Sequence, residues 1–275
     1  MKLSILQNAT PHTTTYYVGN NLEDVKHLKG CTLICRKDFN PELEEVNLIQ
    51  VDDPQLYFYK LSHKVKNVFL FNDECEPIVG HGVSIGPGCV LGDGVQIGDN
   101  VEIGANTVIY ANTKIGPDTI IGSNVTIGTA GMMWVWDGDN KVILRQLGGV
   151  DIGKGCTIGS GCVIVRGSAN EITKIGDNTI LAPATAIGHG AKIGNSVHFA
   201  NNVTVGGSVT VQDYNFFGCA AVINPRVRIM ANDVLVGAGA VITREIVESG
   251  VYVGAPAKKI KEVGTFHRGI PKWTR

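Results

Sequence analysis

The sequence has no excess of charge of either sign. Its 275 residues include 24 lysines and arginines against 25 aspartates and glutamates, a net charge of -1. Proteins that bind the phosphates of nucleic acid carry clustered positive charge, so the near-equal numbers of positive and negative residues argue against a nucleic-acid partner. The sequence also lacks any apolar run near the roughly 18 residues of a membrane span. We therefore expect a protein without a membrane span that works in the cytoplasm.

Cysteine is present, but without the spacing of a functional site. The number of cysteines is odd, and none forms the C-x-x-C pair of a zinc or redox site. Free cysteine packs like a small hydrophobic residue, so we expect burial for all of them and no metal site. The cysteines are Cys31, Cys35, Cys75, Cys89, Cys156, Cys162 and Cys219.

Glycine, by contrast, is abundant, and it accompanies a six-residue repeat. The 35 glycines are about twice the roughly 7% of ordinary proteins. From Val79 onward an aliphatic or aromatic residue recurs every six positions, with gaps after Ile127 and Ile164 and a shift of one before Val236. The repeated positions are Val79, Ile85, Leu91, Ile97, Ile103, Ile109, Ile115, Ile121, Ile127, Ile152, Ile158, Ile164, Ile175, Leu181, Ile187, Ile193, Phe199, Val205, Val211, Phe217, Ile223, Ile229 and Val236.

So long a fixed period predicts a stacked architecture. Each repeat forms one short parallel strand and a corner, three repeats form a triangular coil, and the repeated side chain points into the prism. Glycine and asparagine suit the corners because they tolerate positive φ. Coils stack about 4.8 Å apart, so roughly 23 repeats form nearly eight coils. We predict a mainly β protein whose residues 78–245 form a parallel β-helix.

The segments that flank the repeats have a different character. Residues 1–77 contain no hexads and read as a small α/β domain, with strands at Thr32–Cys35 and Asn47–Val51. A helix is expected from Pro54 to Lys66, capped by Asp53. Residues 246–275 form a C-terminal tail.

The two gaps in the repeat are excursions near residues 129–150 and 166–174. They follow the ninth and twelfth repeats, so both leave from one edge of the prism. The fifteenth repeat places His189 at that edge, in a column with Thr129, Arg166 and Gly207. Loops on a rigid scaffold concentrate function, so His189 is a candidate general base. A solvent-exposed corner histidine is the alternative.

The first excursion is unusually apolar, with Met132, Met133, Trp134 and Trp136 in close succession. Such a segment covers either a site or a neighbouring chain, because a large exposed apolar patch is rare on a monomer. We expect a homotrimer with active sites between chains.

Several motifs along the chain together carry a family resemblance. They are Val51-Asp52-Asp53-Pro54, Ala111-Asn112, Ile127-Gly128, the segment ending Gln146-Leu147-Gly148, Arg166-Gly167, Ile187-Gly188-His189 and Gly250-Val251-Tyr252. In these motifs the sequence resembles UDP-3-O-acylglucosamine N-acyltransferase and, more loosely, hexapeptide acyltransferases of nucleotide-linked amino sugars. This resemblance implies a left-handed β-helix.

The resemblance also implies a set of site residues. His189 stands where the family has its catalytic histidine, and Gly207 matches the glycine whose amide stabilises an oxyanion. Trp134, Gln146 and Arg166 are implied at the substrate. The stretch that holds Tyr16, Tyr17 and Asn20 corresponds to the part that binds the nucleotide base by stacking, although two adjacent tyrosines also suit the core and the surface of a strand.

The tail bears on the acyl donor. Gly254-Ala255-Pro256-Ala257-Lys258-Lys259 resembles the tail of coenzyme A-dependent hexapeptide acetyltransferases, which implies that Lys258 and Lys259 lie near the cofactor. A charged closing helix is the alternative reading. The long C-terminal helical segment of the lipid A enzyme is missing, and Ala182 and Pro183 replace its polar residues. We therefore favour acyl-CoA over acyl carrier protein as the donor.

These implications predict an N-acyltransferase for cell-surface polysaccharide or lipopolysaccharide synthesis, which moves an acyl group from a thioester to the amine of a nucleotide-linked amino sugar. Acyl carrier protein-dependent synthesis of lipid A is the alternative, and a non-enzymatic β-helix scaffold is another. A zinc enzyme like the hexapeptide carbonic anhydrases would have to gather His81, His189 and His198. Residues 1–77 are too short for a nucleotidyltransferase domain.

Overall fold

The computed structural model describes residues 1–65, 75–263, 266–267 and 270–271. The chain divides into two compact units. The N-terminal unit comprises Met1–Asn67, Ala130–Gly148 and Gly167–Glu171, and the β-helix unit comprises Val68–Thr129, Gly149–Arg166 and Ile172–Arg275. The excursions therefore cluster with the N-terminal residues, whereas the sequence predicts them as part of the domain 78–245.

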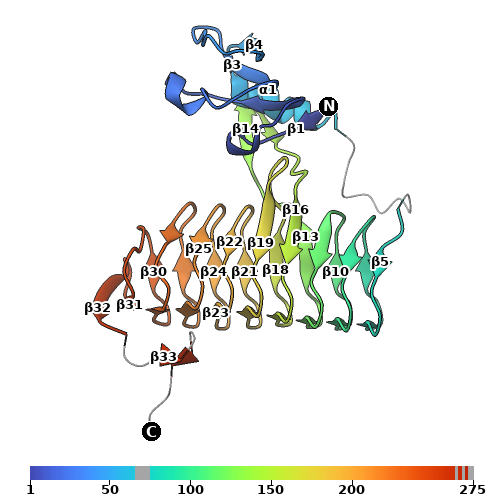
Figure 1. The fold of residues 1–275 in the computed structure, drawn as a ribbon, viewed down its shortest axis with the longest axis vertical. Coiled ribbons are helices and arrows are strands. Elements are labelled where there is room, and N and C mark those ends of the chain that lie inside the picture. The colour runs from blue at the N-terminus through green and yellow to red at the C-terminus, as the bar shows by residue number, and fades with distance from the viewer. Residues whose placement is uncertain (66–74, 264–265, 268–269, 272–275) are drawn as a thin grey trace. The chain divides into compact units, whose positions relative to one another are not determined.

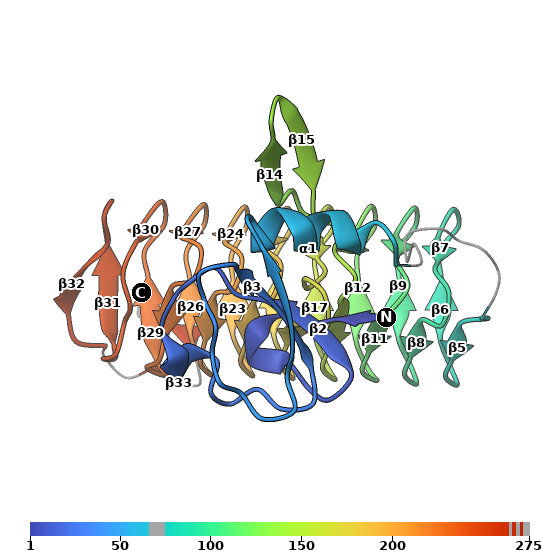
Figure 2. The same cartoon turned by 90° about the horizontal axis from the view of Figure 1, so that it is seen from above.

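The β-helix unit contains three parallel sheets, which form the three faces of the prism (Figure 1). The coils stack in chain order from one end to the other (Figure 2). The first face consists of β5 (Ile78–Val79), β8 (Gln96–Ile97), β11 (Thr113–Ile115), β16 (Gly149–Ile152), β19 (Ile172–Ile175), β22 (Lys192–Ile193), β25 (Thr210–Val211) and β28 (Arg228–Ile229).

The second face has two strands more than the first. It consists of β6 (Ser84–Ile85), β9 (Glu102–Ile103), β12 (Ile120–Ile121), β17 (Thr157–Ile158), β20 (Ile180–Leu181), β23 (His198–Phe199), β26 (Phe216–Phe217), β29 (Val234–Val236), β31 (Gly250–Val253) and β32 (Lys258–Lys261). The strand β32 runs antiparallel to β31, so the lysines of the tail lie on a strand. The alternative of a charged closing helix was therefore wrong.

The third face carries both excursions. It consists of β7 (Val90–Leu91), β10 (Val108–Ile109), β13 (Thr126–Thr129), β18 (Val163–Val165), β21 (Ala186–Ile187), β24 (Thr204–Val205), β27 (Val222–Ile223) and β30 (Val241–Ile242). The chain leaves this face after β13 and again after β18, which are neighbours in the sheet. The expectation that both excursions start from one edge is confirmed.

The repeated aliphatic residues form the interior of the prism. From Ile97 to Ile242 they are almost completely buried in one continuous cluster, and each stacks on its equivalent one coil away. Asparagines occupy left-handed corner positions, for example Asn106 at φ 56° and Asn178 at φ 55°. Cys156 and Cys162 are buried as expected, but Cys75 and Cys219 are exposed because they lie outside the inward-pointing positions.

The N-terminal unit has a four-stranded parallel sheet in the order β1 (Lys2–Leu3), β2 (Thr13–Tyr16), β3 (Thr32–Arg36), β4 (Asn47–Val51). Short 3-10 turns occur at Leu6–Asn8 and Leu22–Asp24. Side chains alternate along β3: Ile34 joins one cluster with Phe58, and Leu33 and Cys35 join a cluster on the other side. The first cluster also takes in Leu144 from the first excursion and Ala169 from the second.

One helix, α1 (Pro54–Ser62), follows β4 directly. The carboxylate of Asp53 accepts the Leu56 N–H at 2.9 Å, which confirms the expected cap. The helix ends at Ser62 rather than at Lys66, which lies outside the described residues. The Ser62 hydroxyl bonds back to the Tyr59 carbonyl at 2.6 Å and accepts the Arg145 N–H, and such side-chain bonds compete with helix continuation.

The remaining strands form two antiparallel pairs, β14 (Trp134–Asp137) with β15 (Asn140–Ile143), and β33 (Phe266–His267) with β34 (Ile270–Pro271). No helix in the described part of the chain is long and apolar enough to cross a membrane.

Candidate active site at a corner of the prism

His189 and Gly207 lie one above the other at the corner between the third face and the first face. The register pairs Ile187 with Val205, so the residues two places later share a column. A methyl group added to Gly207 would lie 2.4 Å from the Nε2 atom of His189. The imidazole ring therefore rests directly on the Gly207 backbone, and the column expected from the hexad count is confirmed here. We call this edge the His189 corner.

Thr129 and Arg166, in the coils before His189, do not continue this column as expected. The pairing of β13 with β18 shifts between Ile127 and Thr129, so Thr129 aligns with Val165 instead of Arg166. The Arg166 N–H donates to the Thr129 carbonyl at 3.0 Å. The opening of two excursions at this corner explains the slip of one residue, because each exit distorts the turn that it replaces.

Hydrogen bonds hold the backbone around His189 in place. The Gly190 N–H donates to the hydroxyl of Thr173 at 2.8 Å, and that hydroxyl donates to the Val165 carbonyl at 2.7 Å. The His189 carbonyl accepts the Ser208 N–H at 2.7 Å. The half-buried imidazole is thus carried by a turn tied to the coils on both sides.

The amides of this corner differ from those of the corner after the first face. In that other corner, backbone N–H groups donate to an Asp or Asn side chain one coil later. The pairs are His81 with Asp99, Lys154 with Asp177, Asp177 with Asn195, and Asn195 with Asp213. At the His189 corner the next residues are Gly207 and Pro225, which have no acceptor side chain. No acceptor for the Gly207 N–H occurs within the described residues.

Arg166 is buried at the corner from which the two excursions leave. Its side chain is completely buried, its Nε donates to the Gly128 carbonyl at 2.6 Å, and its Nη2 donates to the Ala111 carbonyl at 2.9 Å. Burial lowers its pKa to about 10, so the guanidinium stays charged at neutral pH. The expected contact of Arg166 with substrate does not fit this placement. The guanidinium instead ties together the coils from which the excursions leave.

Gln146 and Trp134 belong to the N-terminal unit. Gln146 is buried, and its Oε1 accepts the Gly131 N–H, so it closes the first excursion at its base. Trp134 is 45% exposed and packs edge-on against Trp136, with the Lys141 ammonium 4.9 Å from its ring centre. Of these two expected substrate residues, Trp134 is partly exposed and Gln146 has a structural role.

The tyrosines expected at the nucleotide base pack on opposite sides of the small sheet. Tyr16 lies 4.8 Å from Phe58 between ring centres, and Tyr17 lies 5.5 Å from Phe39. The Tyr17 hydroxyl donates to Asp24 at 2.6 Å, and this bond raises the pKa of Tyr17. Asn20 is exposed. Core packing, the alternative left open for the tyrosines, accounts for much of their environment.

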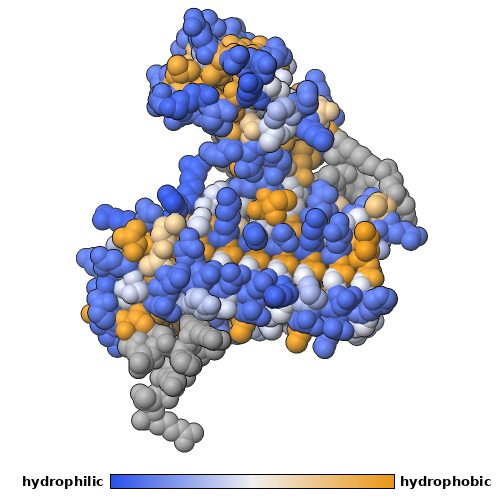
Figure 3. Space-filling view, viewed as in Figure 1, coloured by the Kyte–Doolittle hydropathy of each residue, from blue (hydrophilic) through white to orange (hydrophobic). Residues whose placement is uncertain are grey.

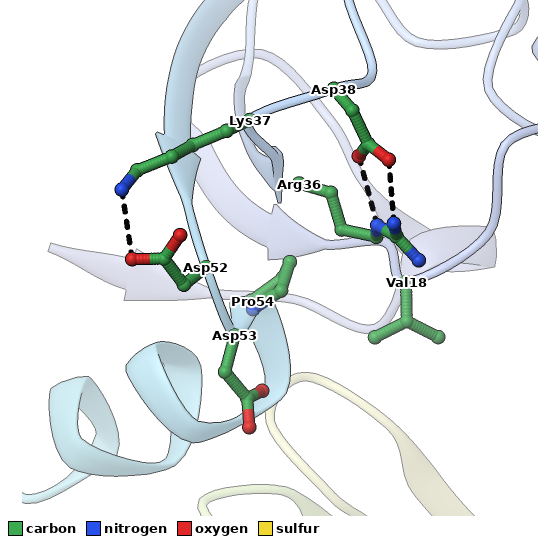
Figure 4. A pocket seen from close by; sticks show the side chains of 7 residues that line it. All are labelled: Val18, Arg36, Lys37, Asp38, Asp52, Asp53 and Pro54. Carbon is green, nitrogen blue, oxygen red and sulfur yellow. Dashed lines mark hydrogen bonds and ion pairs between the residues drawn. The ribbon is translucent and has the colours of Figure 1, made fainter.

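A cavity of about 390 Å³, lined mainly by charged residues, lies beyond the carboxyl ends of β3 and β4, where the sequence predicts no site (Figure 4). Parallel sheets bind ligands at this end. Lys37 pairs with Asp52 at 2.8 Å, and Arg36 pairs with Asp38, which lowers the pKa of that carboxyl. The charged residues that follow each of the two predicted strands could have indicated this cavity in the sequence. The lining residues are Val18, Arg36, Lys37, Asp38, Asp52, Asp53 and Pro54.

The two lysines expected at the cofactor differ in environment. Lys259 lies 2.8 Å from Glu262 and 3.3 Å from Glu248, and hydrogen bonds to these carboxylates raise its pKa. Lys258 is exposed. Two carboxylates thus already neutralise Lys259, which makes it a poor ligand for a phosphate.

The histidines of the zinc alternative are spread over the β-helix. His81 follows β5 in the first coil, and His198 lies on the second face, where its ring packs 5.0 Å from Phe216 and burial lowers its pKa. Among the described residues, no three His, Cys, Asp or Glu side chains converge as a metal would require.

Two families of hexapeptide-repeat proteins match parts of this chain. Residues 76–111 and 94–129 match the bacterial transferase hexapeptide family, and residues 141–167 match the hexapeptide repeat of succinyl-transferase. A comparison with curated proteins gave no match.

Solved structures of acyltransferases are similar to this chain in fold. UDP-N-acetylglucosamine acyltransferase from Bacteroides fragilis is 22% identical with a TM-score of 0.61, over 71% of this chain and 73% of that one. The Arabidopsis enzyme of that name is 25% identical with a TM-score of 0.50, over 70% and 74%. The expected fold class, mainly β with a left-handed parallel β-helix after a small α/β part, is confirmed. The chain has the β-helix fold of these acyltransferases, built on transferase-type hexapeptide repeats.

Proposed function

We propose that the protein is an N-acyltransferase that moves an acyl group from a thioester, acyl-CoA, to the amine of a nucleotide-linked amino sugar. The observation that carries the proposal is the His189 ring seated on Gly207, whose N–H has no acceptor in the described part of the chain. A base and an oxyanion donor are thereby held side by side at a fixed corner. The Arabidopsis UDP-N-acetylglucosamine acyltransferase, similar in fold and sequence, supports acyl transfer to a nucleotide sugar.

The reaction requires one general base and one hydrogen-bond donor to the oxyanion. The sugar amine attacks the thioester carbonyl while the His189 imidazole takes the amine proton. The carbonyl oxygen becomes an oxyanion, which the Gly207 N–H stabilises. Collapse then breaks the carbon–sulfur bond, and the proton passes from His189 to the leaving thiolate. Proton transfer of this kind contributes roughly 10² to 10⁴ in rate, and one oxyanion donor roughly 10² to 10³.

Trp134 offers a partly exposed ring on which a base or sugar of a nucleotide-linked acceptor can stack. Such an acceptor suits the synthesis of cell-surface polysaccharide or lipopolysaccharide.

The proposal is tested by supplying donors and acceptors in pairs. The purified protein is given UDP-linked amino sugars with either acetyl-CoA or acyl carrier protein loaded with an acyl chain, and product is followed by mass spectrometry. Amide formation from the CoA thioester supports the proposal. Much faster transfer from acyl carrier protein than from the CoA thioester would favour the alternative, an acyl carrier protein-dependent enzyme of lipid A synthesis. Formation of an ester on a sugar that has no amine would overturn the proposed N-acylation.

We also propose that the working form is a homotrimer. Met132 and Trp136 are 81% and 55% exposed. Figure 3 shows a line of hydrophobic residues along the β-helix between hydrophilic rows. The outward positions of the third face are largely apolar. They include Val90, Val108, Val163, Ala186, Val222 and Val241.

Sedimentation equilibrium at micromolar concentration is expected to give three times the chain mass, because stable interfaces bury more than about 1,000 Å² and flat apolar faces supply such areas. A monomer under these conditions would contradict the trimer.

A further inference from the structure

Backbone hydrogen bonds join successive coils at the His189 corner. The Ser208 N–H donates to the His189 carbonyl one coil earlier at 2.7 Å, and the Arg226 N–H donates to the Gly207 carbonyl at 2.8 Å. In both pairs, the fourth residue of a hexad, counted from its inward-pointing residue, binds the third residue of the hexad one coil earlier.

Gly190 departs from this pattern, although it belongs to the same turn as His189. The strand register places Arg166 one coil before His189, so the Arg166 carbonyl would be the regular acceptor for the Gly190 N–H. The chain enters the second excursion directly after Arg166. The Gly190 N–H donates instead to the hydroxyl of Thr173 at 2.8 Å. A side chain thus takes the place of the backbone acceptor at this turn.

The Thr173 hydroxyl also joins the two ends of the second excursion. It donates to the Val165 carbonyl at 2.7 Å. Val165 ends β18, after which the chain leaves the prism, and Thr173 lies in β19, where the chain returns. The side chain of Thr173 is completely buried. One hydroxyl therefore connects the turn that carries His189 to the strands before and after the excursion.

Packing alone does not require a hydroxyl at this position. The column of Thr173 continues with Val150 one coil earlier and with Ala191 and Val209 in the next two coils. All three of these residues are apolar and buried. A valine would therefore suit the space that Thr173 fills, and its loss would be confined to the hydrogen bonds.

We propose that Thr173 is a positioning residue, whose hydroxyl holds the turn after β21 so that the His189 imidazole stays on the Gly207 backbone. This proposal rests on the proposed function, in which His189 is the general base. Glycine restricts its own backbone less than any other residue, and Gly190 follows His189 directly. The bond to Thr173 supplies the missing restraint, because a catalytic group is effective only when its geometry is held by its surroundings.

Thr173→Val removes the hydroxyl and keeps the shape of the side chain. The kcat for amide formation is expected to fall about tenfold to a hundredfold with KM nearly unchanged, because displacing a reacting group by about 1 Å can cost 10² in rate. Thr173→Ala, which introduces the residue found one coil later at Ala191, is expected to give the same loss. Thr173→Ser keeps the hydroxyl and is expected to retain most of the native kcat.

Thr179→Val is the matched control. Thr179 is equally buried, and its hydroxyl also forms two bonds: it accepts the Val197 N–H at 3.2 Å and donates to the Gly194 carbonyl at 2.9 Å. Both partners lie at the corner after the first face, away from His189. The two valine variants are expected to lower the urea midpoint by similar amounts, whereas only Thr173→Val is expected to lower kcat.

A second measurement needs no turnover. The ring resonances of His189 are recorded by nuclear magnetic resonance in protein that carries isotope-labelled histidine, and they are assigned by their loss in His189→Ala. They are expected to shift in Thr173→Val and to stay in place in Thr179→Val.

The outcomes separate the role of Thr173 from the reaction. Native kcat in Thr173→Val, an equal fall of kcat in Thr179→Val, no recovery in Thr173→Ser, or unchanged His189 resonances in Thr173→Val would each overturn the proposal. Shifted His189 resonances in Thr173→Val alone, in a protein that acylates no amino sugar, would support the role of Thr173 at the turn and contradict the proposed function.

Discussion

Replacing His189 by alanine is expected to lower kcat by about 10² or more, with a smaller change in KM. The proton that His189 takes moves only as the transition state forms, so its loss acts on the chemical step more than on binding. Hydrogen bonds to Thr173 and Ser208 hold the backbone of the turn, so the variant is expected to fold normally. Steady-state kinetics with saturating donor measure the effect.

Two further variants show whether the position of the ring matters. His198→Ala removes a half-buried histidine from the next face and is expected to leave kcat nearly unchanged. Gly207→Ala retains the histidine but introduces a methyl group 2.4 Å from its Nε2, so the imidazole ring must move and kcat is expected to fall. Equal losses in His189→Ala and His198→Ala would remove the case for His189 as the base.

Replacing Arg166 by alanine is expected to destabilise the fold by about 3 to 5 kcal/mol. The change removes the donor to the Gly128 and Ala111 carbonyls and leaves a cavity in the prism. Each buried unsatisfied group costs about 1 to 3 kcal/mol, and the cavity adds to that loss. The midpoint of urea denaturation, followed by circular dichroism, measures the change in the free energy of unfolding.

Arg166→Met separates volume from hydrogen bonding. Methionine fills much of the space and removes a buried charge, and removal of such a charge can offset part of the lost bonds. A smaller loss than in the alanine variant is expected. Arg226→Ala serves as the surface control, with a change within about 0.5 kcal/mol. A midpoint in Arg166→Ala equal to that of the native protein would contradict a structural role for the guanidinium.

The positions that point into the prism were the most predictable from sequence. A side chain such as Ile187 must fill the same volume as Val205 one coil later, so the period of six survives in the sequence. Counting hexads therefore placed His189 on Gly207 without a structure. The hexad count was wrong at Thr129, which aligns with Val165 and not with Arg166. An excursion changes the strand register locally, and the six-residue period of the sequence does not show this change.

The environments of polar side chains were less predictable. Sequence alone does not distinguish an arginine that faces a substrate from one that is buried and donates to backbone carbonyls, as Arg166 does. Lys259 gains its two carboxylates only through the pairing of β32 with β31 and its neighbours. The Gly207 amide without an acceptor could have been noticed in the sequence, since Gly207 and Pro225 stand where the corner after the first face has residues such as Asp177, Asn195 and Asp213.

The discontinuity of the N-terminal unit affects how the chain matures during synthesis. The cluster around Ile34 and Phe58 needs Leu144 and Ala169, which the ribosome adds only after several coils of the β-helix have been made. The first 67 residues therefore emerge before two buried members of this cluster have been made. A fragment cut after residue 77 would lack Leu144 and Ala169 and would expose the side of the sheet that they help to cover.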